Sequence, residues 1–234
     1  MSEEKYIGIV SALPVESMII KVMMEDRVEE IFAGTTFNRG TIYGRKAVFM
    51  NCGVGKVNAA MYTQLLIDRY KPACILFTGV AGSMSEKVKH NDLVLADQLT
   101  YFDVNPKQLE NCFPNIVRFR ADAELGSIIK AQAPECRRGL IITGDQFIHD
   151  RAEKERLKAA FPDALCVEME GCAFAQVCKM NDVPFAILRC ITDLADDDAE
   201  ESYKKFEMQA AMTSADIIAK AIKEMGDFVK GEDE

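Results

Sequence analysis

The stretch LCVEMEGCAFAQVC, residues 165–178, joins an expected strand to an expected helix. Its first three residues form an apolar run that suits a buried strand, and small and apolar side chains after residue 171 recur at the spacing of a buried helix face. Two carboxylates, Glu168 and Glu170, stand at the joint between them. Burying a charge is costly unless the charge is paired, so these carboxylates need a structural or chemical reason to be there.

The same alternation of apolar strands and helical segments extends over the rest of the chain. Strands are expected at residues 6–11, 73–79, 92–102, 139–145, 165–170 and 184–193, with a strand meander at residues 28–53. Helices are expected near residues 14–24, 57–69, 122–132, 151–160, 171–181 and 202–229. This alternation predicts an α/β fold, with a mixed, largely parallel sheet and helices on both faces. No linker or internal repeat interrupts it, so residues 1–234 are expected to form a single domain.

The overall charge argues against one class of partner. The 234 residues carry a formal net charge of −9. Such a chain would repel the phosphates of nucleic acids, so neither DNA nor RNA is an expected partner. The negative charge does not exclude nucleosides as ligands, since they carry no phosphate.

The expected compartment is the cytoplasm. The first 18 residues, MSEEKYIGIVSALPVESM, lack the basic start and the long apolar run of a signal peptide. No apolar stretch approaches the roughly 20 residues of a membrane span, so no membrane partner is expected. The eight cysteines are scattered, form no CxxC pair and are accompanied by only two histidines. They are interpreted as reduced core residues, and no metal site is expected.

Two glycine-rich stretches invite nucleotide-binding interpretations that their spacing does not support. GVGK, residues 53–56, has Met50 where a phosphate-binding loop needs its first glycine and Val57 where the loop needs Ser or Thr. TGVAGS, residues 78–83, follows a strand but lacks GxGxxG. No nucleotide cofactor is therefore expected. TGVAGS is interpreted either as a loop whose backbone approaches a ligand or as a tight turn.

Polar residues follow several of the expected strands, where ligands bind in α/β sheets. They lie at Glu16 and at residues 79–83, 145–148, 168–170 and 192–193. Taken singly, Glu16 suits the first turn of a helix and Glu170 suits a helix start, and both structural interpretations stay open. Taken together, Glu16, Glu170 and Asp193 beside Phe147 suit cleavage of a glycosidic bond, which needs an acid, a base and a sugar-binding carboxylate.

Six motifs spread over nearly the whole chain carry a family resemblance. They are IGIVSALPVE (7–16), CGVGKVNAA (52–60), TGVAGS (78–83), GDQFIH (144–149), VEMEG (167–171) and LRCITDLAD (188–196). In this order they resemble the nucleoside phosphorylase superfamily, and specifically its 5′-methylthioadenosine/S-adenosylhomocysteine nucleosidases. The VEME motif followed by a strand that ends in Thr-Asp is the specific part. The resemblance implies a three-layer α/β/α fold and hydrolysis of an adenine nucleoside to adenine and a 5-thioribose, without a cofactor.

The resemblance also implies a role for each candidate residue. Asp193, with Thr192 beside it, would protonate purine N7, and Glu16 would orient and deprotonate the attacking water. Glu170 would bind the ribose hydroxyls, with Glu168 as structural support. Around the base, Phe147 would stack on adenine, and the backbone of Ile148 would contact the base edge. Met169 would pack on the ribose, Gly82 would lie against the ligand, and Arg189 would steady Glu170. The residues near the apolar 5′-substituent would be Leu13, Val54, Tyr203 and Phe206.

Two parts of the chain depart from the commoner pattern of this family. Val80 stands where many members have Ser, so a polar side-chain contact near the attacking water is expected to be missing. Residues 100–119 lack the family's aromatic-Gly-Tyr cluster. In the family this segment reaches the site of a neighbouring subunit, so the resemblance implies a homodimer in which residues near 102–115 help to close the partner's site.

Three other functions stay open on the sequence. A purine nucleoside phosphorylase on the same fold would need a cationic phosphate site, whereas SALPVES (11–17) carries a carboxylate and no Arg, which favours hydrolysis. An aminofutalosine-type nucleosidase would use the same carboxylates with a longer 5′ group. A catalytically silent nucleoside-binding protein would be expected to lose one of the three carboxylates, and all three are present.

Overall fold

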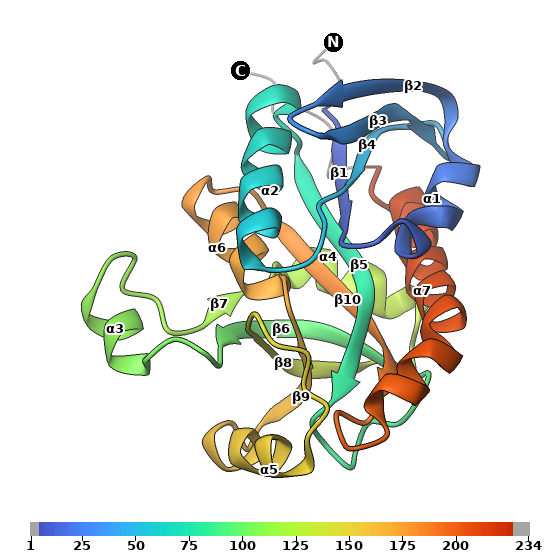
Figure 1. The fold of residues 1–234 in the computed structure, drawn as a ribbon. Helices are drawn as coiled ribbons and strands as arrows, with labels where there is room; N and C mark the ends of the chain where they lie inside the picture. The colour runs from blue at the N-terminus through green and yellow to red at the C-terminus, as the bar shows by residue number, and fades with distance from the viewer. Residues whose placement is uncertain (1–4, 227–234) are drawn as a thin grey trace.

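Strand β1 (Ile7–Ser11) lies inside the sheet and pairs in parallel with β4 (Arg45–Asn51) and β5 (Cys74–Ser83). The computed structural model describes residues 5–226 of the chain (Figure 1). Beyond β4 the sheet continues through β3 (Thr35–Ile42) to β2 (Glu25–Phe32), with antiparallel pairing at both steps. This edge confirms the strand meander expected there.

On the other side of β1, five strands close a circuit of pairings. Strand β5 pairs in parallel with β10 (Phe185–Asp193) and, near its end, antiparallel with β9 (Ala164–Glu168). Strand β8 (Arg137–Thr143) lies between β9 and β6 (Leu93–Tyr101), and β6 returns to β10. All nine residues of β10 are buried, which explains its continuous apolar run. The carboxyl ends of β5, β9 and β10 are therefore brought together.

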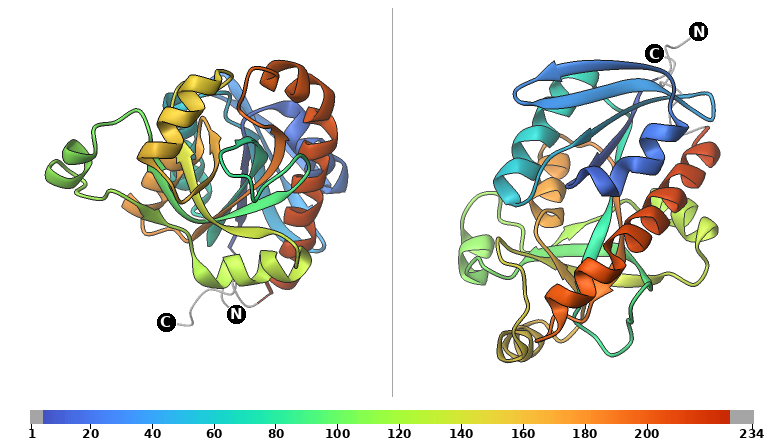
Figure 2. Two further views of the ribbon diagram at one scale, coloured as in Figure 1. Left: turned by 90° about the horizontal axis from the view of Figure 1, so that it is seen from below. Right: turned by 45° about the vertical axis from the view of Figure 1, so that its right-hand side comes forward.

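Helices cover both faces of the sheet, which confirms the three-layer α/β/α arrangement (Figures 1 and 2). One layer holds α2 (Lys56–Tyr70) and α6 (Gly171–Met180), which pack against each other. The other layer holds α1 (Met18–Met23), α4 (Ala123–Gln132) and the long α7 (Ala199–Glu224). Both α1 and α4 contact α7, and α7 packs on β5 and β10.

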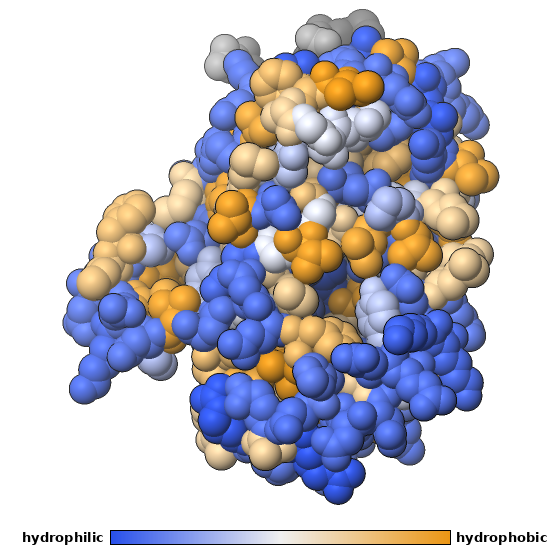
Figure 3. Space-filling model, viewed as in Figure 1, coloured by the Kyte–Doolittle hydropathy of each residue, from blue (hydrophilic) through white to orange (hydrophobic). Residues whose placement is uncertain are grey.

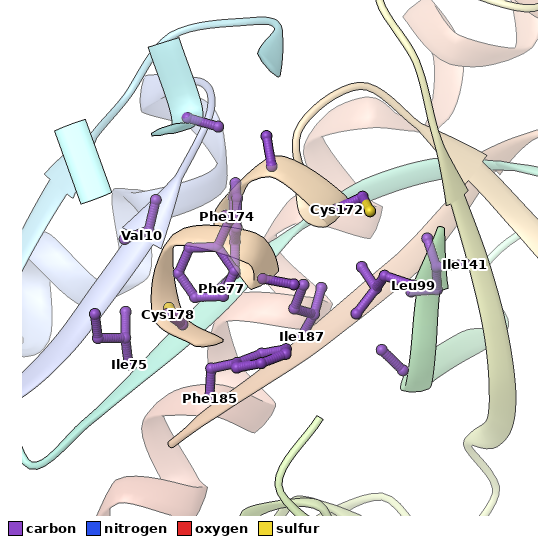
Figure 4. Close-up of a cluster of buried hydrophobic side chains, with 14 of the residues drawn as sticks. Val10, Ile75, Phe77, Leu99, Ile141, Cys172, Phe174, Cys178, Phe185 and Ile187 are labelled. Carbon is purple, nitrogen blue, oxygen red and sulfur yellow. The ribbon is translucent and has the colours of Figure 1, made fainter. Parts of the chain in front are cut away.

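One part of the core lies between the sheet and α6 (Figure 4). Phe77 of β5 and Phe174 of α6 meet edge to face, with ring centroids 5.0 Å apart, and Phe174 contacts Phe185 of β10 at 5.7 Å. Such pairs add to the stabilisation that burial of the rings provides. Cys172 and Cys178 on the same helix are buried and free, as expected for reduced core residues.

The structure differs from the sequence-based expectation mainly between β6 and α4. This segment contains a six-residue helix, α3 (Pro106–Asn111), and a two-residue strand, β7 (Phe119–Arg120), neither of which was expected. Both are too short to show a hydrophobic period. Figures 1 and 2 show α3 projecting from the body of the molecule. Helix α5 (Arg151–Ala160) lies where it was expected.

The two terminal helical segments also differ in detail from the expectation. The first begins as a 3₁₀ turn, Pro14–Ser17, before α1. The last begins at Ala199 rather than at residue 202, and its expected end at Val229 lies outside the described residues. Among the helices of residues 5–226, none combines the length and the apolar character that crossing a membrane requires.

Candidate active site

A cavity of about 370 Å³ opens at the carboxyl ends of β1, β5, β9 and β10, beside the start of α7. Gly82 joins two of these strands, because it pairs with Val167 of β9 and with Asp193 of β10. A Cβ atom on Gly82 would lie 2.7 Å from an Asp193 oxygen, so glycine permits this close approach. The expected site residues that line the cavity are Leu13, Glu16, Val54, Val80, Gly82, Phe147, Met169, Glu170, Thr192, Asp193 and Tyr203.

Glu16 is buried in this cavity, and its carboxylate accepts three backbone N–H groups. Its Oε2 accepts from Ala12 at 2.8 Å and from Leu13 at 2.7 Å, and its Oε1 accepts from Val80 at 3.1 Å. Burial raises the pKa of Glu16, while the charge of Arg189 and the three N–H groups act to lower it. Glu16 Oε2 therefore stabilises the turn after β1, while the side chain lines the cavity. The structural and the chemical interpretations of Glu16 are compatible.

Glu170 stands at the start of α6 but makes no side-chain capping bond there. Its Oε1 instead accepts the backbone N–H of Gly55 at 2.8 Å. Gly55 has a φ of +95°, a conformation that favours glycine. Burial first, and then the charge of Glu168, raise the pKa of Glu170. The GVGK loop thus supplies a hydrogen-bond donor to a carboxylate of the cavity.

Glu168 and Arg189 form a buried ion pair, with 2.5 Å between Glu168 Oε2 and Arg189 Nη2. The same oxygen accepts the N–H groups of Glu170 at 3.1 Å and Gly171 at 2.7 Å, so Glu168 caps α6. Its other oxygen accepts the Thr143 hydroxyl. Arg189 lies 3.9 Å from Glu170 Oε2, so it supports Glu170 chiefly through Glu168 and less directly than expected.

Gly79 gives the Arg189 guanidinium its space. A Cβ atom on Gly79 would lie 1.9 Å from Arg189 Nη1 and 2.8 Å from Glu16 Oε1. The guanidinium also packs on the ring of Phe77, with its carbon 4.3 Å from the ring centroid. Gly79, the first glycine of TGVAGS, therefore leaves space for the buried Arg189 guanidinium, whereas Gly82 faces the cavity.

Asp193 ends β10, with both carboxylate oxygens held. Its Oδ2 accepts the hydroxyl of Thr192 at 2.8 Å, and its Oδ1 accepts the N–H of Ala195 at 2.9 Å. Burial is the main cause that raises its pKa, and the charge of Asp196 is a smaller one. Repulsion from the neighbouring Asp196 is therefore secondary to burial in raising this pKa.

Comparisons with known proteins assign this arrangement to a family. The phosphorylase superfamily profile matches residues 6–223 of the chain. The 5′-methylthioadenosine/S-adenosylhomocysteine nucleosidase of Geobacillus thermodenitrificans is 36% identical over 220 residues, which cover 90% of this chain and 93% of that protein. The nucleosidase of Staphylococcus carnosus is 35% identical over 94% of this chain and 100% of its own. The chain belongs to the phosphorylase superfamily, within its 5′-methylthioadenosine/S-adenosylhomocysteine nucleosidase family.

Solved structures agree with this membership of the nucleosidase family. The Neisseria meningitidis nucleosidase in complex with methylthio-immucillin-A superimposes with a TM-score of 0.90 at 30% identity, covering 94% of this chain and 99% of that one. A futalosine hydrolase of Helicobacter pylori has a TM-score of 0.88 at 32% identity, with 94% and 98% coverage. The same fold thus also occurs in an enzyme named as a futalosine hydrolase.

The aromatic residues expected in a nucleosidase site do not all line the cavity. Phe147 is 39% exposed and meets Tyr203 edge to face at 5.8 Å. Ile148 lines a small hollow beside the main cavity, together with Gly82 and Asp193. Phe206 is not among the residues that line the cavity, and its ring lies 4.8 Å from that of His90.

Two charged residues of the cavity were missed from the sequence. Glu200 and Lys204 line it from the start of α7, four residues apart on one helix face. That spacing was available as a signal, but Glu200 belongs to the acidic run after Asp193, and charged runs of this kind are usually solvated. Within residues 5–226, no group of three His, Cys, Asp or Glu side chains is arranged to hold a metal ion.

Proposed function

We propose that the protein hydrolyses the N-glycosidic bond of 5′-methylthioadenosine and S-adenosylhomocysteine, releasing adenine and a 5-thioribose derivative. The observation that carries the proposal is the meeting of three buried carboxylates, Glu16, Glu170 and Asp193, in one cavity at the strand ends. Each is held by hydrogen bonds in a distinct environment, which is what separate roles require.

Asp193 is the general acid in this proposal. Adenine is a poor leaving group as an anion, so the departing base needs a proton at N7. Burial raises the pKa of Asp193, which favours its protonated form. The hydroxyl of Thr192 and the N–H of Ala195 fix the carboxyl group at the end of β10. Phe147 stacks on the base, and the backbone of Ile148 reads its edge.

Glu16 activates water, and Glu170 holds the sugar. Backbone N–H groups fix both carboxylates, so each can be aimed without rearrangement at the anomeric carbon or at the ribose hydroxyls. A carboxylate near the ribose also stabilises the positive charge that develops on the sugar ring as the bond breaks. Met169 packs on the ribose between these groups. Val80 gives its N–H to Glu16, which supplies a polar contact although the side chain is apolar.

The charge of the cavity favours water over phosphate as the acceptor of the sugar. In the described part of the chain, the cavity is lined by Glu16, Glu168, Glu170, Asp193 and Glu200, against the single cation Lys204. Arg189 lies below the lining and is already paired with Glu168. A phosphate dianion would meet net negative charge there and lacks a cationic clamp.

A 5′-aminofutalosine-type nucleoside is the second candidate substrate, favoured by the similarity to the futalosine hydrolase structure. The same three carboxylates would act on it, and only the 5′ end of the cavity would differ. Leu13, Val54 and Tyr203 line the cavity and are mainly apolar, which favours a thioether substituent. Adenine release measured in parallel from methylthioadenosine, adenosylhomocysteine and aminofutalosine tests the assignment. A strong preference for aminofutalosine would overturn it.

We also propose that the protein acts as a homodimer in the cytoplasm. Large apolar side chains are exposed in three places: Val54 of the cavity lining is 45% exposed, Val57 on α2 is 77% exposed, and Phe113 on the projecting segment is 85% exposed. Figure 3 shows hydrophobic side chains gathered across the middle of the face that is viewed in Figure 1. A second copy would cover them, with residues near 102–115 helping to close the partner's cavity. An active monomer in sedimentation at assay concentration would contradict the dimer.

A further inference from the structure

Lys56, the first residue of α2, is at the centre of a charge network beside the cavity. Its ammonium lies 2.7 Å from Asp103 Oδ2, which follows β6, and 3.5 Å from Asp145 Oδ2, which follows β8. The side chains of Lys56 and Asp103 are each 21% exposed. The ammonium also lies 5.5 Å from the ring centroid of Tyr101. One cation thus neutralises two carboxylates from two different loops, and salt screens its pair with Asp103 less than its pair with Asp145, whose side chain is 49% exposed.

Backbone hydrogen bonds tie the same residues together. The backbone N–H of Lys56 donates to Asp145 Oδ1 at 2.8 Å, so Asp145 satisfies a free donor at the start of α2. The N–H of Asp145 donates to Asp103 Oδ2 at 3.0 Å. Position 55 is also restricted, because a Cβ atom there would lie 3.2 Å from Asp145 Oδ1. The start of α2 is therefore fixed by its side-chain and backbone bonds to two loops.

This fixed helix start is what Glu170 contacts. Gly55, which directly precedes Lys56, donates its N–H to Glu170 Oε1 at 2.8 Å. That N–H lies in the peptide plane between Val54 and Gly55, so its direction depends on how Gly55 joins the fixed start of α2 at Lys56. Glu170 makes no capping bond in its own helix, and its contact with Arg189 is 3.9 Å long. The Gly55 N–H is therefore a principal hydrogen bond that orients its carboxylate.

We propose that Lys56, through its ion pairs with Asp103 and Asp145, is a positioning residue that aims the Glu170 carboxylate at the ribose. The inference rests on the proposed role of Glu170 in binding the sugar. Without the ammonium, two carboxylates would repel each other at the start of α2. The loops would separate, and the Gly55 N–H would turn from Glu170. Lys56 is not among the residues that line the cavity, so its proposed effect passes through Gly55 and Glu170.

A double-mutant cycle with Lys56→Met and Glu170→Gln tests this inference. Lys56→Met keeps most of the side-chain length and removes the charge. We expect it to lower kcat/KM for methylthioadenosine by roughly ten- to a hundredfold, the scale of a misplaced contact group. In a Glu170→Gln background, Lys56→Met should lower kcat/KM by at most about threefold, because the carboxylate that Lys56 positions is already absent. Lys56→Arg, which retains the charge, should restore most of the activity.

Controls separate positioning from a general loss of structure. Lys220→Met removes an ion pair of 2.6 Å with Asp216 on the outer side of α7 and should leave kcat/KM unchanged. Lys56→Met should bind free adenine as the unaltered protein does, because the base contacts of Phe147 and Asp193 do not include Glu170. Weak adenine binding together with an early thermal transition would show a collapsed site and overturn the positioning role.

The remaining outcomes are also decisive. An equal loss from Lys56→Met in both backgrounds would mean that Lys56 acts independently of Glu170, and unchanged kinetics would mean that it positions nothing. Either result would overturn the inference while leaving the proposed function intact. Absence of adenine release by the unaltered protein would sink the proposed function itself.

Discussion

Arg189 and Glu168 form an ion pair that lies wholly inside the protein, with side chains 0% and 2% exposed and 2.5 Å between Nη2 and Oε2. Glu168 also caps α6 at the point where Glu170 enters the cavity. The pair thus supplies both the charge balance and the backbone geometry beneath the candidate site. Two glutamates therefore stand at the joint between β9 and α6 because Glu168 pairs with Arg189 and caps the helix, while Glu170 lines the cavity.

Removing Arg189 should be strongly destabilising. Arg189→Met leaves Glu168 buried without its cation, and the expected loss in the free energy of unfolding is about 3–5 kcal/mol. The matched control is Arg118→Met, which breaks an ion pair with Asp163 whose side chains are 39% and 50% exposed. That change should cost no more than about 1 kcal/mol. Urea unfolding of both variants measures the difference, and equal small losses would contradict the importance of the buried pair.

Glu16→Gln and Glu170→Gln should each lower kcat/KM by about a hundredfold or more, because each removes a proton acceptor or a charge contact. At position 170 the amide oxygen can still accept the Gly55 N–H, and at position 16 it can still accept those of Ala12 and Leu13 while the Val80 N–H loses its acceptor, so the fold should persist with a modest loss of stability. Glu200→Gln serves as a control that should leave kcat/KM nearly unchanged, since Glu200 lines the cavity but is exposed and is not one of the three carboxylates proposed to act on the substrate. Steady-state kinetics with methylthioadenosine checks this. Near-normal activity of Glu16→Gln would mean that another residue activates the water.

The buried carboxyl group of Asp193 should make stability fall as pH rises. Burial raises its pKa in the folded protein, so the folded state binds its proton more tightly than the unfolded state does. The resulting stabilisation is complete below the unfolded pKa, near 4, and is lost as pH rises through the higher folded value. Asp193→Asn removes this titration. Its stability relative to the unaltered protein should therefore increase between pH 4 and 8 in urea unfolding, and a constant difference would contradict the raised pKa.

The sequence predicted Glu16, Glu170 and Asp193 because each follows an apolar run that ends at the same edge of the sheet. It did not show that Glu170 bonds to Gly55, a contact between residues 115 apart in the chain. The resemblance assigned Arg189 to Glu170, whereas the structure pairs it with Glu168, because Glu168 and Glu170 are alike as residue types and only the turn into α6 separates their side chains. The two elements of the 100–119 segment were missed for another reason, because α3 has six residues and β7 has two, too few for a hydrophobic period to repeat.

Asp193→Asn separates proton transfer from binding. Asn keeps the size and can donate a hydrogen bond, but it has no proton to transfer to N7. We expect adenine binding to persist while kcat falls by roughly 10²–10⁴-fold. A nucleoside whose leaving group needs no protonation should recover much of that loss. If the variant is equally impaired on that nucleoside, Asp193 holds the site together without acting as an acid.

The identity of the sugar product tests the proposed hydrolysis most directly. Methylthioadenosine is incubated with the protein in phosphate buffer made with ¹⁸O-labelled water, and the sugar product is analysed by mass spectrometry. Hydrolysis predicts free 5-methylthioribose carrying one labelled oxygen at C1, formed at the same rate with and without phosphate. A 5-methylthioribose 1-phosphate product, or a strict requirement for phosphate, would contradict the proposal that the Glu16 carboxylate directs water to the sugar.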